Sequence, residues 1–153
     1  MDQIKIENLK VFAFHGVYSS EKDKGQNFYV NATLYTDFRE VGDEIEKSTD
    51  YSEVCNTIKE TMTSRNYDLI ETVAEKVANA ILINFPRIDS VDIEIRKPQA
   101  PVPMEFESIS VKVTRGWADV YLSYGSNLGD LEENIDTALF KLCDRRDCKM
   151  IQN

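Results

Sequence analysis

Apolar side chains recur at three- and four-residue steps between residues 70 and 82, and this repeat constrains the fold more than any other part of the chain. It predicts a helix with a broad apolar face, which must pack on a sheet or on another helix. Asp68 and Glu71 have the spacing of a capping box at its start, and Pro86 ends it. The face consists of Ile70, Val73, Ala74, Val77, Ala78, Ile81 and Leu82.

A shorter predicted helix precedes this one. Val54, Ile58 and Met62 form a narrower apolar stripe, and Asp50 and Glu53 again have capping-box spacing. We therefore expect two consecutive helices that share an apolar layer.

Two pairs of alternating segments flank these helices. Residues 4–13 alternate with a change of parity between Ile6 and Leu9, which predicts a strand with a bulge or kink. Residues 28–35 predict a second strand that pairs with the first as an antiparallel hairpin, joined by the polar loop HGVYSSEKDKGQ. Residues 91–96 and 109–114 predict two further strands. The order ββααββ indicates an α+β domain, an antiparallel sheet with helices on one face.

The chain changes character after Gly116. Val120, Leu122 and Tyr124 predict a strand, which is followed by a glycine turn and a helix containing Leu131, Ile135, Ala138, Leu139 and Leu142. A strand and a helix cannot bury their own apolar faces, so this segment must pack on the first unit, pack on another chain, or stay poorly ordered. We expect one domain over 1–116 and an incomplete βα fragment over 117–153.

Composition excludes several functions. The chain has 153 residues and a formal net charge of -9, which argues against binding nucleic acid or an anionic membrane. It contains no apolar run long enough to cross a bilayer, and its N-terminus is too polar for a secretory signal. Three sparse cysteines, Cys55, Cys143 and Cys148, indicate reduced thiols and a cytoplasmic location. A single histidine, His15, argues against a zinc site.

The stretch EIRKPQAPVP places Lys97 where a predicted strand meets three prolines. Because proline fixes its own φ and cannot continue a central strand, Lys97 lies between a rigid element and a stiff loop. Alternation directs the neighbouring Arg96 to the other face of the sheet. Lys97 is either an ordinary surface charge or an amine positioned for chemistry.

Four segments together resemble the dihydroneopterin aldolases of folate synthesis: FHGVYSSEKDKGQ, TDYSEV, DLIETVAEKVA and IRKPQAPVP. The resemblance covers residues 1 to about 115, the whole ββααββ unit. It implies the tunnelling fold, in which subunits close into a barrel as tetramers or octamers with active sites between subunits. YGSNLGDLEENI resembles the start of a 6-hydroxymethyl-7,8-dihydropterin pyrophosphokinase. This implies a bifunctional folate enzyme cut short, and we expect no pyrophosphokinase activity from residues 117–153.

The resembled family cleaves 7,8-dihydroneopterin, a pterin, to 6-hydroxymethyl-7,8-dihydropterin and glycolaldehyde by a retro-aldol step. The substrate's own C=N unit accepts the electrons, so the resemblance implies neither a cofactor nor a metal nor a lysine Schiff base. The implied catalytic residues are Lys97 as proton carrier, Tyr51 stacking on the pterin and reprotonating the enol, and Glu21 holding a water or the substrate hydroxyls. To act as a base near neutral pH, Lys97 requires a lowered pKa, and burial is the expected cause.

The implied substrate-binding residues are Glu71, Ile70 and Thr49. The carboxylate of Glu71 can accept two hydrogen bonds from a pterin ring, with Ile70 beside it and Thr49 lining the pocket through its backbone. Simpler interpretations stay open: a helix cap for Glu71, a packed aromatic for Tyr51 and a solvated loop charge for Glu21.

Three alternative functions share parts of this pattern. The same site could epimerise C2′ or act on the triphosphate form of the substrate. A zinc-dependent pterin synthase of related fold needs several histidines, which this chain lacks. The third alternative is a pterin-binding or oligomerisation module without catalysis. Lys97→Ala discriminates here, because unchanged retro-aldol turnover would contradict a catalytic role for Lys97.

Overall fold

The computed structural model describes residues 1–121, 129–145 and 148 of the chain. The chain divides into two compact units, Met1–Trp117 and Ala118–Asn153. No helix in the described ranges is long and apolar enough to cross a membrane.

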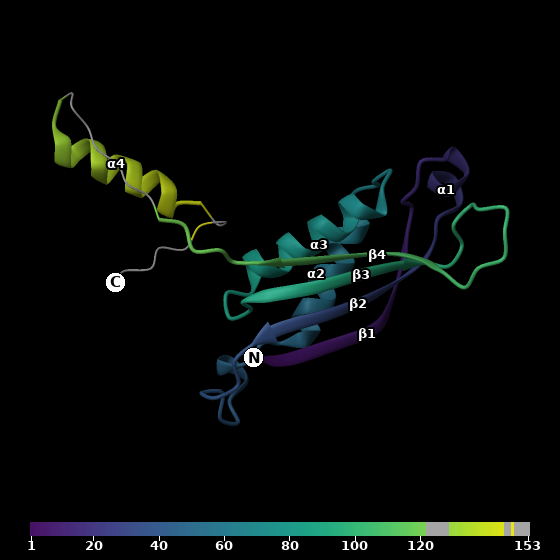
Figure 1. Cartoon of the computed structure of the whole chain (residues 1–153), viewed down its shortest axis with the longest axis horizontal. Coiled ribbons are helices and arrows are strands. Elements are labelled where there is room, and N and C mark those ends of the chain that lie inside the picture. Colours follow the sequence, from purple (N-terminus) through teal and green to yellow (C-terminus); the bar gives the residue numbers. More distant parts are fainter. Residues whose placement is uncertain (122–128, 146–147, 149–153) are drawn as a thin grey trace. The chain divides into compact units, whose positions relative to one another are not determined.

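The first unit is built on an antiparallel sheet with strand order β1-β2-β3-β4 (Figure 1). The strands are β1 (Asp2–Ala13), β2 (Gln26–Thr36), β3 (Ser90–Lys97) and β4 (Ile109–Gly116). All four strands predicted from alternation in this unit are confirmed.

The kink in β1 is also confirmed. The register with β2 shifts between Ile6 and Leu9, and Asn8 in the gap has a positive φ of 54°. The backbone N–H of Asn8 donates to the side-chain oxygen of Asn31 on β2 at 2.7 Å. The extra residues of this bulge explain the change of parity in the sequence.

Two long helices cover one face of the sheet, α2 (Tyr51–Thr63) and α3 (Ile70–Asn84) (Figure 1). Their predicted apolar faces pack against the inward residues of the strands, and burial along β3 alternates strictly. The fully buried side chains of this layer include Phe28, Val30, Leu34, Val54, Ile58, Met62, Val73, Val77, Ile81, Ile93 and Ile95.

Helix capping agrees with the sequence in part at α2 and disagrees at α3. Asp50 caps α2, since its carboxylate accepts from the backbone N–H groups of Ser52 and Glu53, but no return bond from the Glu53 side chain completes a capping box. The capping box predicted for Asp68 with Glu71 is wrong, because the N-cap of α3 is Leu69 and has no side-chain cap. Asp68 instead forms an ion pair with Lys22 at 2.6 Å.

The polar loop predicted between β1 and β2 is partly wrong. It contains a short helix, α1 (Ser19–Lys24). A single 3-10 turn, η1 (Ile45–Lys47), lies in the connection before α2. Neither short element changes the ββααββ order.

The described part of the second unit contains one helix, α4 (Leu131–Cys143), at the predicted place. Gly129 precedes it with a φ of 72°, and Asp130 caps its first turn by accepting from the N–H groups of Glu132 and Glu133. Val120 and Tyr121 are not in a strand. The rest of the predicted strand and glycine turn, 122–128, lies outside the described residues.

Candidate active site

Lys97 is the last residue of β3 and belongs to the face of this strand that points toward the helices. Alternation puts Val91, Ile93 and Ile95 in the core, and Lys97 continues the same face with only 8% of its surface exposed. Its Nζ lies 2.5 Å from Oε1 of Glu21. The surface-charge interpretation of Lys97 is therefore wrong.

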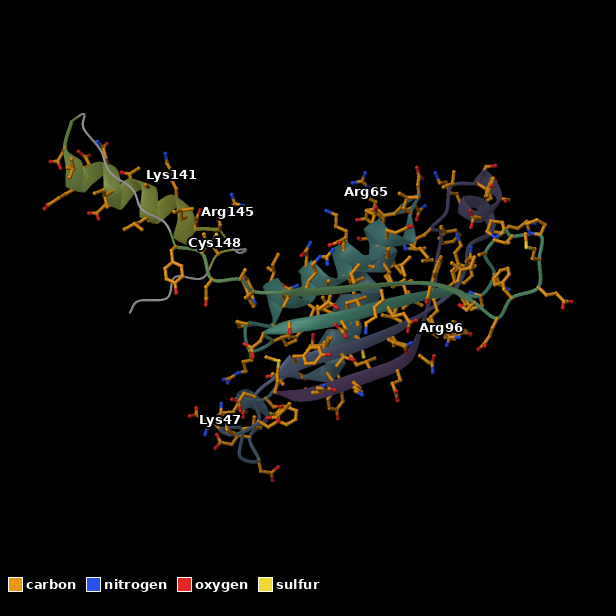
Figure 2. All side chains as sticks on the ribbon, viewed as in Figure 1. Lys47, Arg65, Arg96, Lys141, Arg145 and Cys148 are labelled. Carbon is orange, nitrogen blue, oxygen red and sulfur yellow. The ribbon has the colours of Figure 1, made fainter. Side chains whose placement is uncertain are left out.

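Arg96 points to the opposite face, as alternation predicts. Its guanidinium donates to the side-chain oxygen of Asn8 at 3.2 Å and pairs with Glu107 at 3.4 Å. Figure 2 labels Arg96 beside the sheet, away from the two long helices. The charge of Arg96 is thus separated from the Lys97–Glu21 pair by the sheet.

Glu21 lies on α1 and is as buried as Lys97, so its interpretation as a solvated loop charge is wrong. Its Oε1 also accepts from Nε2 of Gln26 at 3.2 Å, and its Oε2 accepts from the backbone N–H of Tyr18 at 3.3 Å. Burial alone would raise the pKa of Glu21, but the hydrogen bonds from Lys97, Tyr18 and Gln26 outweigh burial and lower this pKa. Glu21 is therefore held as a carboxylate beside the amine.

Gly16 makes room for this carboxylate. A Cβ at Gly16 would lie 2.3 Å from Oε2 of Glu21, and the φ of Gly16 is 153°. Both the space and the backbone conformation require glycine. The β1–β2 connection, which contains Gly16, thus allows α1 to place Glu21 against the end of β3.

His15 is fully buried and close enough to Lys97 to feel its charge. Its ring contacts the rings of Phe28 and Tyr67, and the backbone N–H of Tyr67 donates to its Nδ1 at 3.1 Å. Burial lowers the pKa of His15; the backbone carbonyl of Met62 opposes this shift, and the charge of Lys97 adds to it. Nε2 has no hydrogen bond of normal geometry to any described residue. His15 is therefore a neutral imidazole that accepts at Nδ1.

Ile70 and Glu71 begin α3 at the same end of the sheet as Lys97. The N–H of Gly16 donates to the carbonyl of Tyr67 at 2.9 Å, which fixes the start of α3 next to the end of β1. Ile70 is buried in the core and Glu71 is exposed. The first-turn N–H groups of α3 and the Glu71 carboxylate are thus available to a ligand from one helix start.

Thr49 and Tyr51 lie at the other end of the sheet. Helix α2 starts at Tyr51, and Met62 near its C-terminus is the residue beside His15. A helix rises about 1.5 Å per residue, so Tyr51 and Met62 are separated by roughly 16 Å along α2. Thr49 is buried, whereas Tyr51 is 59% exposed, so Tyr51 is not a packed core aromatic in the single chain. The structure thus brings Lys97, Glu21 and the α3 start together but leaves Thr49 and Tyr51 apart from them.

Sequence reasoning missed Gln26 and Tyr67 at this site. Gln26 is the first residue of β2 and is buried with Glu21, and Tyr67 is half-buried under Arg65, whose guanidinium lies 5.6 Å from the ring centre. Figure 2 shows Arg65 at the turn between α2 and α3. Gln26 is a polar residue at an inward-facing position at the start of a strand, and this pattern could have indicated the site. The sequence around Tyr67 carries no comparable signal.

The site has the groups for proton transfer and for holding a planar heterocycle. It contains a buried amine–carboxylate pair, a helix start with free N–H groups, and an exposed acid in that first turn. Among the described residues no three His, Cys, Asp or Glu side chains gather as metal ligands would. The four-stranded antiparallel sheet with both long helices on one face is the architecture of the tunnelling fold. Its buried amine–carboxylate pair beside a helix start is an arrangement that acid–base chemistry can use.

Comparison with known proteins identifies the family. The FolB dihydroneopterin aldolase family matches residues 4–114. The chain is 33% identical over 120 residues to a dihydroneopterin aldolase of Methylorubrum extorquens, covering 77% of this chain and 92% of that protein. The chain belongs to the dihydroneopterin aldolase family.

Solved structures agree with this assignment. A putative dihydroneopterin aldolase from Vibrio cholerae superposes with a TM-score of 0.71 at 29% identity, covering 76% of this chain and 98% of that one. The E. coli dihydroneopterin aldolase in complex with neopterin superposes with a TM-score of 0.69 at 28% identity, covering 76% and 100%. The likeness spans the first unit, since the family match ends at residue 114.

Proposed function

We propose that the chain cleaves 7,8-dihydroneopterin by a retro-aldol reaction, using Lys97 and Glu21 to move protons. The observation that carries this proposal is the buried ion pair, with Nζ of Lys97 2.5 Å from Oε1 of Glu21. A pair at this distance can exchange a proton and return it, which a retro-aldol step requires. Family membership supports the choice of substrate.

The step needs one base and one acid. The base takes the proton of the 2′-hydroxyl, the C1′–C2′ bond breaks, and C2′ becomes the carbonyl of glycolaldehyde. The bonding pair forms a C6=C1′ double bond, and the electrons of the N5=C6 bond take up a proton at N5. Protonation of the resulting enol at C1′, with loss of the N5 proton, then gives 6-hydroxymethyl-7,8-dihydropterin.

The ion pair is the starting point of the proposed proton transfers. Its ammonium must give up a proton before the Lys97 amine can act as a base. We infer that, as the substrate hydroxyls enter, the Lys97 ammonium passes one proton to the Glu21 carboxylate, which leaves a neutral amine that accepts the proton of the 2′-hydroxyl. Lys97 then returns that proton on the product side.

The start of α3 is the proposed pterin anchor. The Glu71 carboxylate can accept from the 2-amino group and the neighbouring ring N–H of a pterin, and the N–H groups at Ile70 and Glu71 can donate to its carbonyl oxygen. Both residues lie at the Lys97 end of the sheet, which supports one ligand contacting all of them.

We propose that Thr49 and Tyr51 reach this ligand from a neighbouring subunit. Within one chain they lie at the far end of α2, so a complete site requires a second copy. Among the described residues no strand pairs with the outer edges of β1 and β4, which supports closure of the sheets into a ring of subunits. A tetramer or octamer is the expected assembly.

Incubation with 7,8-dihydroneopterin, with and without a chelator, tests the reaction. We expect 6-hydroxymethyl-7,8-dihydropterin and glycolaldehyde in equal amounts, and the same rate with chelator. Release of the C2′ epimer in place of glycolaldehyde would favour the epimerase alternative. Neopterin binding without any product would favour a pterin-binding module.

Mixing two inactive variants tests the shared site. Lys97→Ala and Tyr51→Phe subunits, unfolded and reassembled together, should recover activity in about one site in four if each site takes these residues from different chains. Each variant reassembled alone is the control. Recovery no greater than in the controls would contradict the shared site.

We also propose that residues 117–153 belong to the start of a pyrophosphokinase segment, with 1–116 as the aldolase domain. Support comes from the resemblance of YGSNLGDLEENI and from the capped helix α4 that follows Gly129. We expect no transfer of pyrophosphate from ATP and Mg²⁺ to 6-hydroxymethyl-7,8-dihydropterin by this chain, and turnover would contradict that expectation. The cytoplasmic location and the lack of nucleic-acid binding stay predictions.

A further inference from the structure

His15 is the buried polar residue of the site that the proposed chemistry leaves without a task. It is fully buried, and it is the only histidine in the chain. A buried polar side chain costs stability unless its polar atoms are hydrogen-bonded, so its bonding partners indicate what it contributes. Its Nδ1 has one described partner, the backbone N–H of Tyr67 at 3.1 Å.

His15 and Gly16 together grip a single residue of the α2–α3 connection. Nδ1 of His15 accepts from the N–H of Tyr67, and the N–H of Gly16 donates to the carbonyl of Tyr67 at 2.9 Å. Both backbone groups of Tyr67 are thus bound by two consecutive residues. We call this pair of hydrogen bonds the Tyr67 clasp.

The Tyr67 clasp joins the two halves of the site that one chain supplies. On one side it leads in three residues to Ile70, where α3 and the proposed pterin anchor begin. On the other side Gly16 lies directly against the carboxylate of Glu21, where a Cβ would come within 2.3 Å of Oε2. The Lys22–Asp68 pair at 2.6 Å links the same two segments, but both its side chains are largely exposed to water.

We propose that His15 is a positioning residue, which through the Tyr67 clasp holds the start of α3 in register with the Lys97–Glu21 pair. This proposal rests on the proposed function for its catalytic consequence. A retro-aldol step needs the hydroxyl of the substrate at the amine while the ring stays at the helix start, so a shift of about 1 Å between them lowers the rate strongly.

Two substitutions of nearly equal shape separate this role from simple packing. In His15→Asn the amide oxygen can take the position of Nδ1 and accept from Tyr67, whereas His15→Leu has the same branching and no acceptor. His15→Gln is a third variant, in which the amide lies too far along the side chain to reach that N–H. His15→Gln takes the place of His15→Leu in the comparison if His15→Leu does not fold.

The measurements are kcat and KM for 7,8-dihydroneopterin, neopterin affinity, and amide hydrogen exchange at Tyr67, all well below each variant's melting temperature. We expect His15→Leu and His15→Gln to lose at least tenfold in kcat/KM and in neopterin affinity, with faster exchange at Tyr67. His15→Asn should stay within about threefold of wild type in all three. Equal values for the Leu, Gln and Asn variants would overturn the proposal.

A wild-type chain that binds neopterin but does not cleave dihydroneopterin would contradict the proposed function and not the clasp. In that case neopterin affinity and amide exchange at Tyr67 decide. Weaker binding and faster exchange in His15→Leu and His15→Gln, with near wild-type values in His15→Asn, support the positioning role. The same values in all three variants overturn it. If neopterin does not bind, exchange at Tyr67 and at the first turn of α3 decides by the same comparison.

Discussion

Strand β3 takes part in two lysine–carboxylate pairs, one on each face. The pairs consist of the same charged groups but differ in burial and in the elements that supply their partners. On the helix side Lys97 pairs with Glu21 at 2.5 Å, and the two side chains are 10% and 7% exposed. On the helix-free side Asp92 pairs with Lys112 of β4 at 2.9 Å, and that lysine side chain is 60% exposed. Alternation along one strand is enough to produce both environments.

The difference lies in what holds each carboxylate. Asp92 accepts from Lys112, Thr114 and Tyr35, all on the sheet, and these bonds lower its pKa. Glu21 comes from a separate short helix and lies against Gly16 and Gln26, so its position depends on a folded loop. The outer pair is part of a sheet surface, whereas the inner pair is a site that the chain assembles.

Replacing the lysine of each pair by alanine should give the largest difference, measured as kcat, between the two faces. We expect Lys97→Ala to reduce kcat by about 10²- to 10⁴-fold, the usual contribution of a general acid–base residue. Lys112→Ala, the matched control from the other pair, should keep kcat within about twofold, since it does not lie at the Lys97 end of the sheet. Steady-state kinetics on both variants check this, and similar losses in the two would remove the functional distinction between the faces.

Substitution of glycine tests how far Glu21 depends on its loop. Gly16→Ala places a methyl group on the Glu21 carboxylate and should lower kcat/KM by about 10²-fold through displacement of the pair. Gly42→Ala is the control, because Gly42 also has a positive φ of 58° but no atom within 4 Å of the added Cβ. Gly42→Ala should affect stability without affecting kcat, and a kcat loss equal to that of Gly16→Ala would contradict the displacement.

The pH dependence of stability should distinguish the two faces. His15 has a pKa lowered from 6.5, so below that value the unfolded chain binds more protons than the folded one. The free energy of unfolding should therefore fall as the pH drops through and below 6.5, and His15→Asn should abolish this part of the dependence. Glu21 and Asp92, with pKa values lowered from 4.5 and 3.8, contribute stability that is lost only below those values.

Denaturant unfolding at pH values between 4 and 8 measures this effect. Because His15 is the chain's only histidine, no other imidazole can produce a slope in this window. An unchanged slope in His15→Asn would show that His15 titrates normally in the folded protein.

The smallest expected effect is that of salt concentration on the stability contributed by the outer pair. The Asp92–Lys112 pair is open to water on one side, so we expect Asp92→Asn to lower the melting temperature slightly at low salt and still less at 1 M salt. Activity should not change in either condition. A large loss of stability that salt does not reduce would mean that Asp92 supports the sheet through Thr114 and Tyr35 more than through Lys112.

The four strands of the first unit, the long helices and the family could be predicted from sequence because each depends on local spacing or on several motifs in register. The bulge near Asn8 was visible as a change of parity. Two of the failures share a physical cause, because Asp68 and Glu21 bind partners far along the chain. Asp68 binds Lys22 instead of capping α3, and Glu21 turns inward because it pairs with Lys97.

The candidate site shows the same limit. Lys97 could be picked out by the prolines that follow it, but its ion partner could not, since 76 positions separate Glu21 from Lys97 in the chain. The separation of Tyr51 from Lys97 follows from the direction in which α2 runs, which spacing alone does not specify.

That direction has a consequence for the assembled ring. Helix α2 touches the floor of one reaction centre with Met62 and presents Tyr51 at its other extremity, where the neighbouring centre is expected. In the proposed assembly each copy of α2 would therefore contribute to two adjacent sites, with Met62 at one and Tyr51 at the next.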